Sequence, residues 1–246
     1  MTVFTAEERQ RLQDELVSVA RADPRISGAA LTGSAALDRE DRWSDIDLAL
    51  CVSTEAGQAI DDWTSRMYGE HGAVDHLDVP RGETLFRVFL LRDTLQVDLS
   101  FWPRDTFGPI GPSFRLLFGT AARPTPAPDP GAAELIGAGW LYALHARSSI
   151  ERGRVWQAEY MISGVRDHVL ALACARYGLP TVQGRGMSGL PPEATAVAAR
   201  ALVASADIVE LRRAFVAATE ALLEETRRVD PERADRLAGP LGDLAS

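Results

Sequence analysis

The sequence predicts an α+β protein with a small mixed β-sheet flanked by helices in its front half and an all-helical bundle in its back half. Three observations lead to this prediction. Alternating apolar and polar residues indicate strands within residues 1–119. Four prolines among small residues in 120–131 disfavour both helix and central strand. Apolar residues at helical spacing dominate 132–246, so we predict a front domain (1–119), a linker (120–131) and a helical domain (132–246).

The first element is a helix. Thr5 and Glu8 fit a capping box, and the apolar spacing that follows ends near Asp23 and Pro24. The next run, RISGAALTG, predicts a short strand that leads into a glycine turn.

The second strand is the run DIDLALCV at residues 45–52, which alternates strictly between two faces. One face is apolar and carries Ile46, Leu48, Leu50 and Val52. The other face begins with two acids and carries Asp45, Asp47, Ala49 and Cys51. The strand therefore presents two carboxylates side by side.

The rest of the front half predicts a helix over residues 55–71 and two further strands, ETLFRVFLL and TLQVDLSFW, joined by a turn at Arg92 and Asp93. In the last strand Asp98 is a single acid on the face opposite the apolar residues. In the back half, helices are predicted over 132–152, 155–178, 191–205 and 207–228, interrupted by the glycine-rich loop QGRGMSG.

Composition narrows the classes of partner. The net charge is -9 at pH 7, and the basic residues are 26 arginines with no lysine. Sequence-independent binding to DNA or RNA depends on basic patches, so we expect no nucleic-acid partner. We predict no signal peptide and no membrane span, and therefore a cytoplasmic protein. An acidic protein suits a cationic small molecule, although the charge also suits plain solubility.

The two acids of residues 45–52 indicate a metal site. Two residues apart on a strand, the Cα atoms of Asp45 and Asp47 are expected about 6.5 to 7 Å apart, at a rise of about 3.3 Å per residue. Carboxylates so placed can share Mg²⁺, which takes its remaining ligands from water and substrate phosphates. Gly33 allows close approach of an anion and Ser34 adds a donor, so this turn is the expected phosphate site.

These motifs together resemble the signature of the polymerase-beta-type nucleotidyltransferase superfamily. The signature is a Gly-Ser pair, then ten residues, then Asp-x-Asp at the start of a strand, and later a single Asp in a hydrophobic strand. It covers about residues 28–52 and 95–100. The Ser-Asp-Ile-Asp run, the chain length and the helical back half are most similar to the bacterial aminoglycoside nucleotidyltransferases.

The resemblance implies attack of a hydroxyl on the α-phosphate of a nucleoside triphosphate, with release of pyrophosphate. By matching position, Gly33, Ser34 and Ser44 would bind the phosphates, and Asp45, Asp47 and Asp98 would bind a pair of Mg²⁺ ions. The expected donor is ATP and the transferred group AMP. Arg42 lies just before the serine-acid motif and would offset triphosphate charge; a solvated arginine is the alternative.

The resemblance also implies a small-molecule acceptor, most plausibly an aminoglycoside-type antibiotic, bound between the two domains. Asp98 or a glutamate of the helical domain would be the general base, and Glu159 is the best candidate for that glutamate. A helix-surface salt bridge is the alternative role for Glu159. The chain is expected to be a monomer or a homodimer.

Two other functions remain open at the level of the sequence. One is a minimal nucleotidyltransferase that modifies a protein or an RNA, as an antitoxin does; the fused helical half counts against it. The other is an inactive relative that binds nucleotide as a sensor or scaffold. The presence of all three acids counts against this function.

Overall fold

The structure is a computed structural model that describes residues 3–53, 56–111, 113–123 and 130–245. The chain divides into two compact units, Met1–Ala127 and Pro128–Ser246, each with its own hydrophobic core. Part of the predicted linker, residues 124–129, lies outside the described residues.

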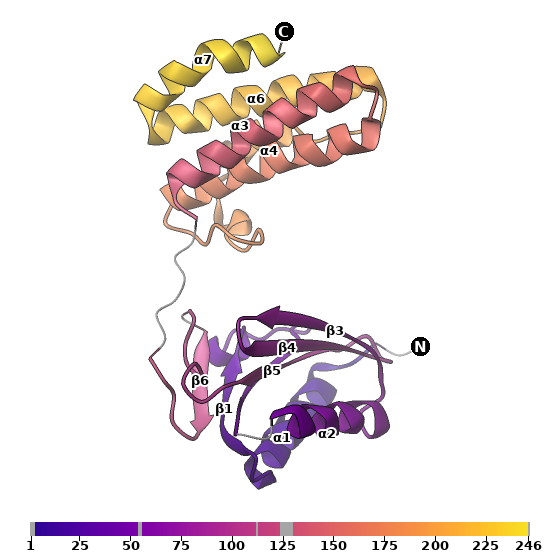
Figure 1. The fold of residues 1–246 in the computed structure, drawn as a ribbon. Coiled ribbons are helices and arrows are strands. Elements are labelled where there is room, and N and C mark those ends of the chain that lie inside the picture. Colours follow the sequence, from indigo (N-terminus) through magenta and orange to yellow (C-terminus); the bar gives the residue numbers. More distant parts are fainter. Residues whose placement is uncertain (1–2, 54–55, 112, 124–129, 246) are drawn as a thin grey trace. The chain divides into compact units, whose positions relative to one another are not determined.

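The first unit contains a mixed six-stranded sheet with the strand order β3-β4-β5-β2-β1-β6 (Figure 1). The strands are β1 (Ile26–Thr32), β2 (Ile46–Val52), β3 (Ala73–Arg81), β4 (Thr84–Leu91), β5 (Gln96–Trp102) and β6 (Phe114–Phe118). Only β2 and β5 pair in parallel among these strands; the other neighbours are antiparallel. The α+β fold class predicted from the sequence is confirmed.

Helices α1 (Ala6–Ala22) and α2 (Ala56–Gly69) both cover the same face of this sheet (Figure 1). Their buried side chains, among them Leu16 and Trp63, share one core with the apolar face of β2. That face carries the residues that the alternating pattern predicts, Ile46, Leu48, Leu50 and Val52, all at most 5% exposed. The predicted capping box at Thr5 and Glu8 is confirmed at the start of α1.

The opposite face of the sheet has a smaller apolar layer, made by Ala49, Cys51 and Trp102 together with Phe107. The indole of Trp102 donates a buried hydrogen bond of 2.8 Å to the Ser100 hydroxyl, so the polar atoms of this layer are paired. Asp47 and Asp98 lie on the same face as this layer, because they are two residues before Ala49 and Ser100 on β2 and β5. Asp47 and Asp98 therefore lie at the edge of this apolar layer.

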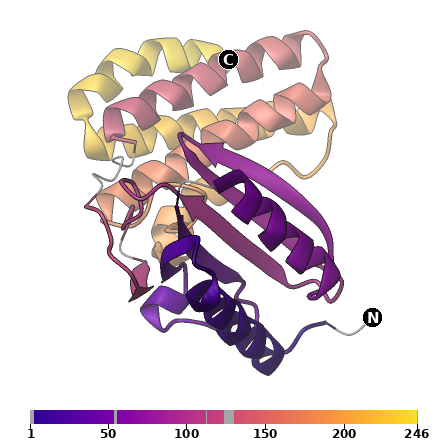
Figure 2. The same ribbon diagram turned by 60° about the horizontal axis from the view of Figure 1, so that its bottom comes forward.

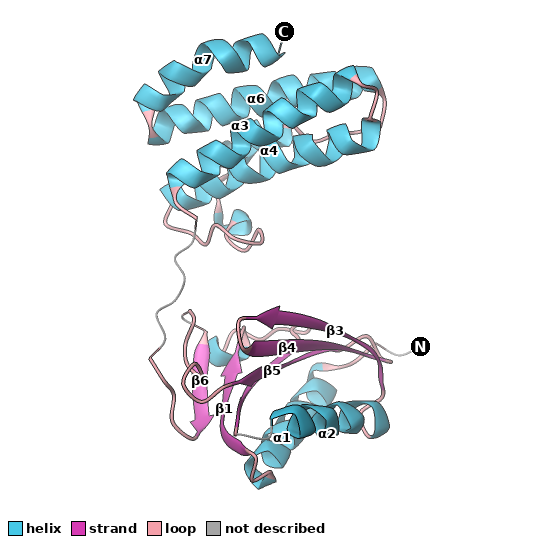
Figure 3. Cartoon of the chain, in the orientation of Figure 1, coloured by secondary structure: helices cyan, strands magenta, loops and turns pink. Residues whose placement is uncertain are grey.

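The second unit is helical (Figure 3). Its helices are α3 (Ala132–Glu151), α4 (Val155–Arg176), α5 (Pro192–Ala199), α6 (Ile208–Val229) and α7 (Pro231–Ala245). Cys174 is buried at the end of α4, in a cluster with Ala194 of α5. Figure 2 shows α3, α4, α6 and α7 lying side by side as a bundle. None of the described helices combines the length and the apolar character that a membrane crossing needs.

Three elements are absent from the sequence-based prediction. Strand β3 has exposed apolar residues such as Leu77, and β6 has five residues, so neither shows a clear alternation. Helix α7 contains Pro240, which obscures its helical pattern. The sequence predicts a helix that extends to residue 205, whereas helix α5 ends at Ala199. The observed end is therefore six residues earlier.

Candidate functional site

The parallel pairing of β2 and β5 brings three acids together. Asp47 and Asp98 are direct partners in the strand register, and Asp45 lies immediately before β2. One ligand oxygen from each of the three carboxylates lies within 4.8 Å of the others. All three residues are half-buried. Adjacent strands thus place three oxygen donors around one point, which suits a hard divalent cation such as Mg²⁺.

Gly33 lies against Asp47 and has no room for a side chain. Its φ of +59° belongs to the left-handed region that favours glycine, and a Cβ atom there would lie 1.8 Å from the Asp47 Oδ2. The turn after β1 therefore approaches the acids as closely as the backbone allows. This contact joins the predicted phosphate turn to the predicted metal ligands.

Two serines were expected to bind phosphate. Ser34 begins a short 3₁₀ turn, Ala35–Leu37, and its side chain makes no capping hydrogen bond there. Ser44 has local partners: its hydroxyl accepts from the Asp41 backbone N–H at 2.9 Å and contacts the Asp41 carboxylate at 3.3 Å. In this structure Ser44 shapes the turn that enters β2, and the phosphate roles of Ser34 and Ser44 stay predictions.

The pKa of one of the three acids, Asp98, is raised. The pKa of Asp98 is raised to about 6, mainly by burial and also by the neighbouring negative charge of Asp45, while a hydrogen bond from Gln96 acts in the opposite direction. Both causes of the increase would be relieved by a cation bound between the carboxylates. The chemistry of the donor set therefore fits the divalent metal that the sequence implies.

Gln96 is a site residue that the sequence analysis does not identify. It is the first residue of β5, and its side-chain Nε2 donates to Asp98 Oδ1 at 3.0 Å and to Asp45 Oδ2 at 3.3 Å. Its position two residues before Asp98 on the same strand face was readable from the sequence. Its reach to Asp45 was not, because that contact depends on how β2 and β5 pair.

Arg42 contacts the N-terminal part of the chain and the ring of the next residue. Its guanidinium donates to the Phe4 carbonyl at 3.0 Å and lies over the Trp43 ring, 4.7 Å from the ring centroid. Arg9 of α1 donates to the Glu40 carboxylate at 2.6 Å, and its side chain is only 6% exposed. Both arginines fasten the loop before β2 to the N-terminal part of the chain, and a phosphate role for Arg42 stays a prediction.

Glu159, the other candidate base, lies on α4 in the second unit. Its carboxylate accepts a hydrogen bond of 2.8 Å from Ser163, one helical turn later. Neither of the alternatives given by the sequence, a base or a surface salt bridge, is decided by that contact. The predicted role of Glu159 and the predicted acceptor position between the domains therefore stay predictions.

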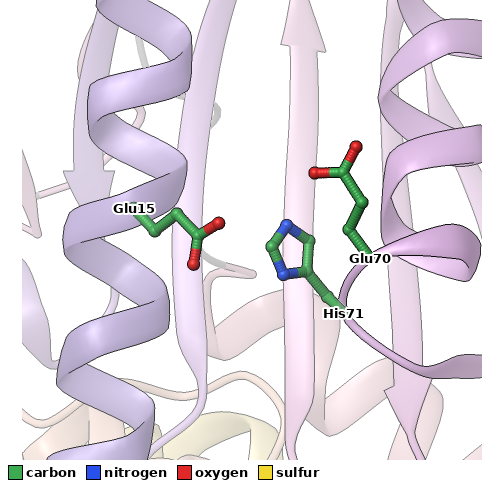
Figure 4. Close-up of side chains that lie close together, drawn as sticks. All are labelled: Glu15, Glu70 and His71. Atoms are coloured by element: carbon green, nitrogen blue, oxygen red, sulfur yellow. The ribbon is translucent and has the colours of Figure 1, made fainter.

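A second group of potential ligands, Glu15, Glu70 and His71, lies on the helical side of the sheet (Figure 4). The Nε2 atom of His71 is buried and has no hydrogen-bond partner among the described residues. Both glutamates are exposed, and Glu70 already forms a salt bridge with Arg66. Because the two glutamates are exposed whereas the three aspartates are half-buried beside a close glycine turn, the three aspartates are the stronger candidate site.

Comparison with known proteins gives one distant likeness. No protein-family model matches the sequence. No curated protein sequence matches it either. Among the solved structures that match is an aminoglycoside 6-adenyltransferase from Bacillus subtilis, with 12% identity, a TM-score of 0.41, and coverage of 96% of this chain and 98% of that one. A likeness of this degree does not establish a family.

Proposed function

We propose that the protein is a Mg²⁺-dependent nucleotidyltransferase that transfers AMP from ATP to a hydroxyl group of a small molecule and releases pyrophosphate. The observation that carries this proposal is the convergence of three carboxylates within 4.8 Å, beside a glycine turn that lies against one of them. Nucleotidyl transfer needs these two parts together, a place for divalent metal and a place where backbone can approach phosphate.

The reaction is a substitution at phosphorus. The acceptor oxygen forms a bond to the α-phosphorus, the bond from that phosphorus to the oxygen bridging to the β-phosphate breaks, and pyrophosphate leaves with the bond electrons. The acceptor's hydroxyl proton passes to a carboxylate base. When bound, Mg²⁺ would supply Lewis-acid stabilisation of the charge on the phosphates.

Different residues of the chain have different proposed roles in this reaction. Asp45, Asp47 and Asp98 would hold the metal, and the backbone at Gly33 and Ser34 would hold the phosphates. Asp98 is also a candidate to accept the proton, because it is the third carboxylate of the resemblance and lies among the proposed metal ligands, next to the reacting groups. Glu159 is the second candidate base. A Glu159→Gln variant with unchanged turnover would leave Asp98 as the base.

We propose an aminoglycoside-type antibiotic as the acceptor. The resemblance in the sequence points to an aminoglycoside-type antibiotic, and the net charge of -9 is compatible with a polycationic acceptor. The intact protein, ATP and Mg²⁺ should be incubated with a panel of aminoglycosides. We expect release of pyrophosphate and an acceptor whose mass rises by one adenylyl group. If no panel member reacts, the acceptor class is wrong.

The metal site is tested separately from the acceptor. Asp47→Asn keeps the size of the side chain but removes a charged ligand, so turnover should fall by more than about 100-fold while the fold is kept. Circular dichroism checks the fold and pyrophosphate release measures turnover. Undiminished activity in this variant would remove the metal-site argument.

A further inference from the structure

The side-chain amide of Gln96 bridges two of the three acids. Its Nε2 carries two hydrogens, and the two contacts, 3.0 Å to Asp98 Oδ1 and 3.3 Å to Asp45 Oδ2, use both. Two carboxylates this close repel each other, and separation by even a small rotation of either side chain would relieve the repulsion. The Gln96 amide opposes that rotation, because a carboxylate that turns away loses its hydrogen bond from the amide.

The hydrogen bonds of Gln96 leave room for a metal ion. They involve one oxygen of Asp45 and one of Asp98, whereas each carboxylate has two oxygens and about four acceptor positions. An ion can therefore bind the same carboxylates while the amide stays in place. Groups that hold a metal ligand in orientation commonly change metal affinity by about 10- to 100-fold.

We propose that Gln96 is a positioning residue, which holds Asp45 and Asp98 at the spacing needed for divalent metal before the metal arrives. This inference rests on the proposed function, since it assigns the metal to the same three acids. It adds a residue that makes no contact with the reacting atoms and acts through its hydrogen bonds to two carboxylates. The exposed position of Gln96 means that a substitution there should leave the core of the unit intact.

The test uses Mn²⁺ alone as the probe, with binding to the full-length protein measured by calorimetry. Gln96→Met removes the donor and nearly conserves the side-chain length. Gln58→Met is the matched control: Gln58 on α2 also donates its amide to a carboxylate, Asp62, at 2.9 Å, but α2 covers the other face of the sheet. Thermal unfolding without metal shows whether either variant is destabilised.

We expect Gln96→Met to bind Mn²⁺ about three- to tenfold more weakly than the wild type, in line with the loss of hydrogen bonds to charged groups. Gln58→Met should bind as the wild type does. In a turnover assay, the Mg²⁺ concentration for half-maximal rate should rise by the same factor, with kcat at saturating Mg²⁺ unchanged. A general structural defect would instead lower kcat and the unfolding temperature.

The possible results separate the two proposals. If the wild type binds Mn²⁺ and Gln96→Met binds it equally well, the positioning role is wrong and the proposed function stands. Tighter binding in Gln96→Met would also overturn the role, because the amide would then be a competitor of the ion. If the wild type binds no Mn²⁺, the metal site and the positioning role fall together.

Discussion

Gly33 shows how one residue couples two parts of the candidate site. Two effects exclude a side chain there, the backbone φ of +59° and the contact with Asp47. Gly33→Ala should lower the free energy of unfolding by about 1–3 kcal/mol, because the new methyl group is strained and displaces the Asp47 carboxylate. Mn²⁺ binding should weaken as well. Urea unfolding and calorimetry measure the two effects.

Gly82 offers a control for the backbone alone. Its φ is +60°, and nothing lies within 4 Å of the position that a Cβ atom would occupy. Gly82→Ala should therefore cost about 1 kcal/mol of stability, the strain of the left-handed conformation, and leave Mn²⁺ binding unchanged. Equal metal binding in Gly33→Ala and Gly82→Ala would contradict the role assigned to the contact with Asp47.

Asp98 is expected to reduce stability at neutral pH. Its pKa is about 6 in the folded chain, raised by burial and by Asp45, against an unfolded value of about 3.9. The folded state therefore binds more protons between these two values, so stability falls as the pH rises from about 4 to 6. Above that range the full cost of ionising the acid is present.

Asp98→Asn should accordingly stabilise the metal-free protein at pH 7.5, by an amount on the order of 1 kcal/mol because the group is half-buried. The same variant should lose turnover. Urea unfolding of both proteins at several pH values measures the difference, which should shrink as the pH falls from 7 towards 4. A stability difference that does not change with pH would show that Asp98 ionises normally.

At the scale of elements, the loop before β2 is held by contacts with α1. The Arg9 side chain is 6% exposed and the Glu40 side chain 19% exposed, and Arg9 Nε has no partner among the described residues. Glu40→Gln removes the only negative charge that pairs with Arg9 in the described salt bridges, so we expect a loss of about 1–3 kcal/mol by urea unfolding.

An exposed pair on the same loop provides the comparison. Asp38 accepts from Arg115 of β6 at 2.5 Å, but the Asp38 side chain is 81% exposed. Asp38→Asn should change the free energy of unfolding by less than about 0.5 kcal/mol, because water already screens that pair. If the two substitutions cost the same, burial of Arg9 is not what makes its contact important.

The strands that carry the acids were predictable because their two faces differ sharply in polarity. The apolar residues of β2 pack on the helices, and the alternation alone places Asp47 on the other face. The order of the strands was not predictable from the same pattern. The contacts of Gly33 and Gln96 depend on which strands pair across the sheet. The local alternation of apolar and polar residues carries no information about that pairing.

Arg42 illustrates the same limit at the scale of one loop. Its sequence position beside the serine-acid motif does not reveal that its guanidinium contacts the Phe4 carbonyl, 38 residues away in sequence. Contacts of this range depend on where α1 packs. The sequence therefore predicted which strands carry the acids better than it predicted what the charged residues around them contact.

At the scale of the molecule, each unit has its own core. The first core joins the sheet to α1 and α2, and the second joins the helices of the bundle. We therefore expect a fragment of residues 1–127 to fold and to bind Mn²⁺ like the full chain. It should not modify the acceptor if, as predicted, the helical unit supplies part of the acceptor site.

This prediction is checked by circular dichroism and calorimetry on the fragment, followed by the acceptor assay. Adding the fragment of residues 128–246 in excess tests whether the two units can restore turnover together. Full activity in the first fragment alone would place the base and the acceptor contacts within that unit, and would exclude Glu159 from the reaction.

The two cysteines give each unit its own chemical reporter. Cys51 of β2 is 2% exposed and Cys174 of α4 is 1% exposed, so neither thiol can meet a reagent until the surrounding core opens. Treatment with an alkylating agent, followed by peptide mass analysis, would thus measure the opening rates of both cores in one experiment. Divalent metal should slow the labelling of Cys51, which lies on the strand of the acids, and leave that of Cys174 unaltered.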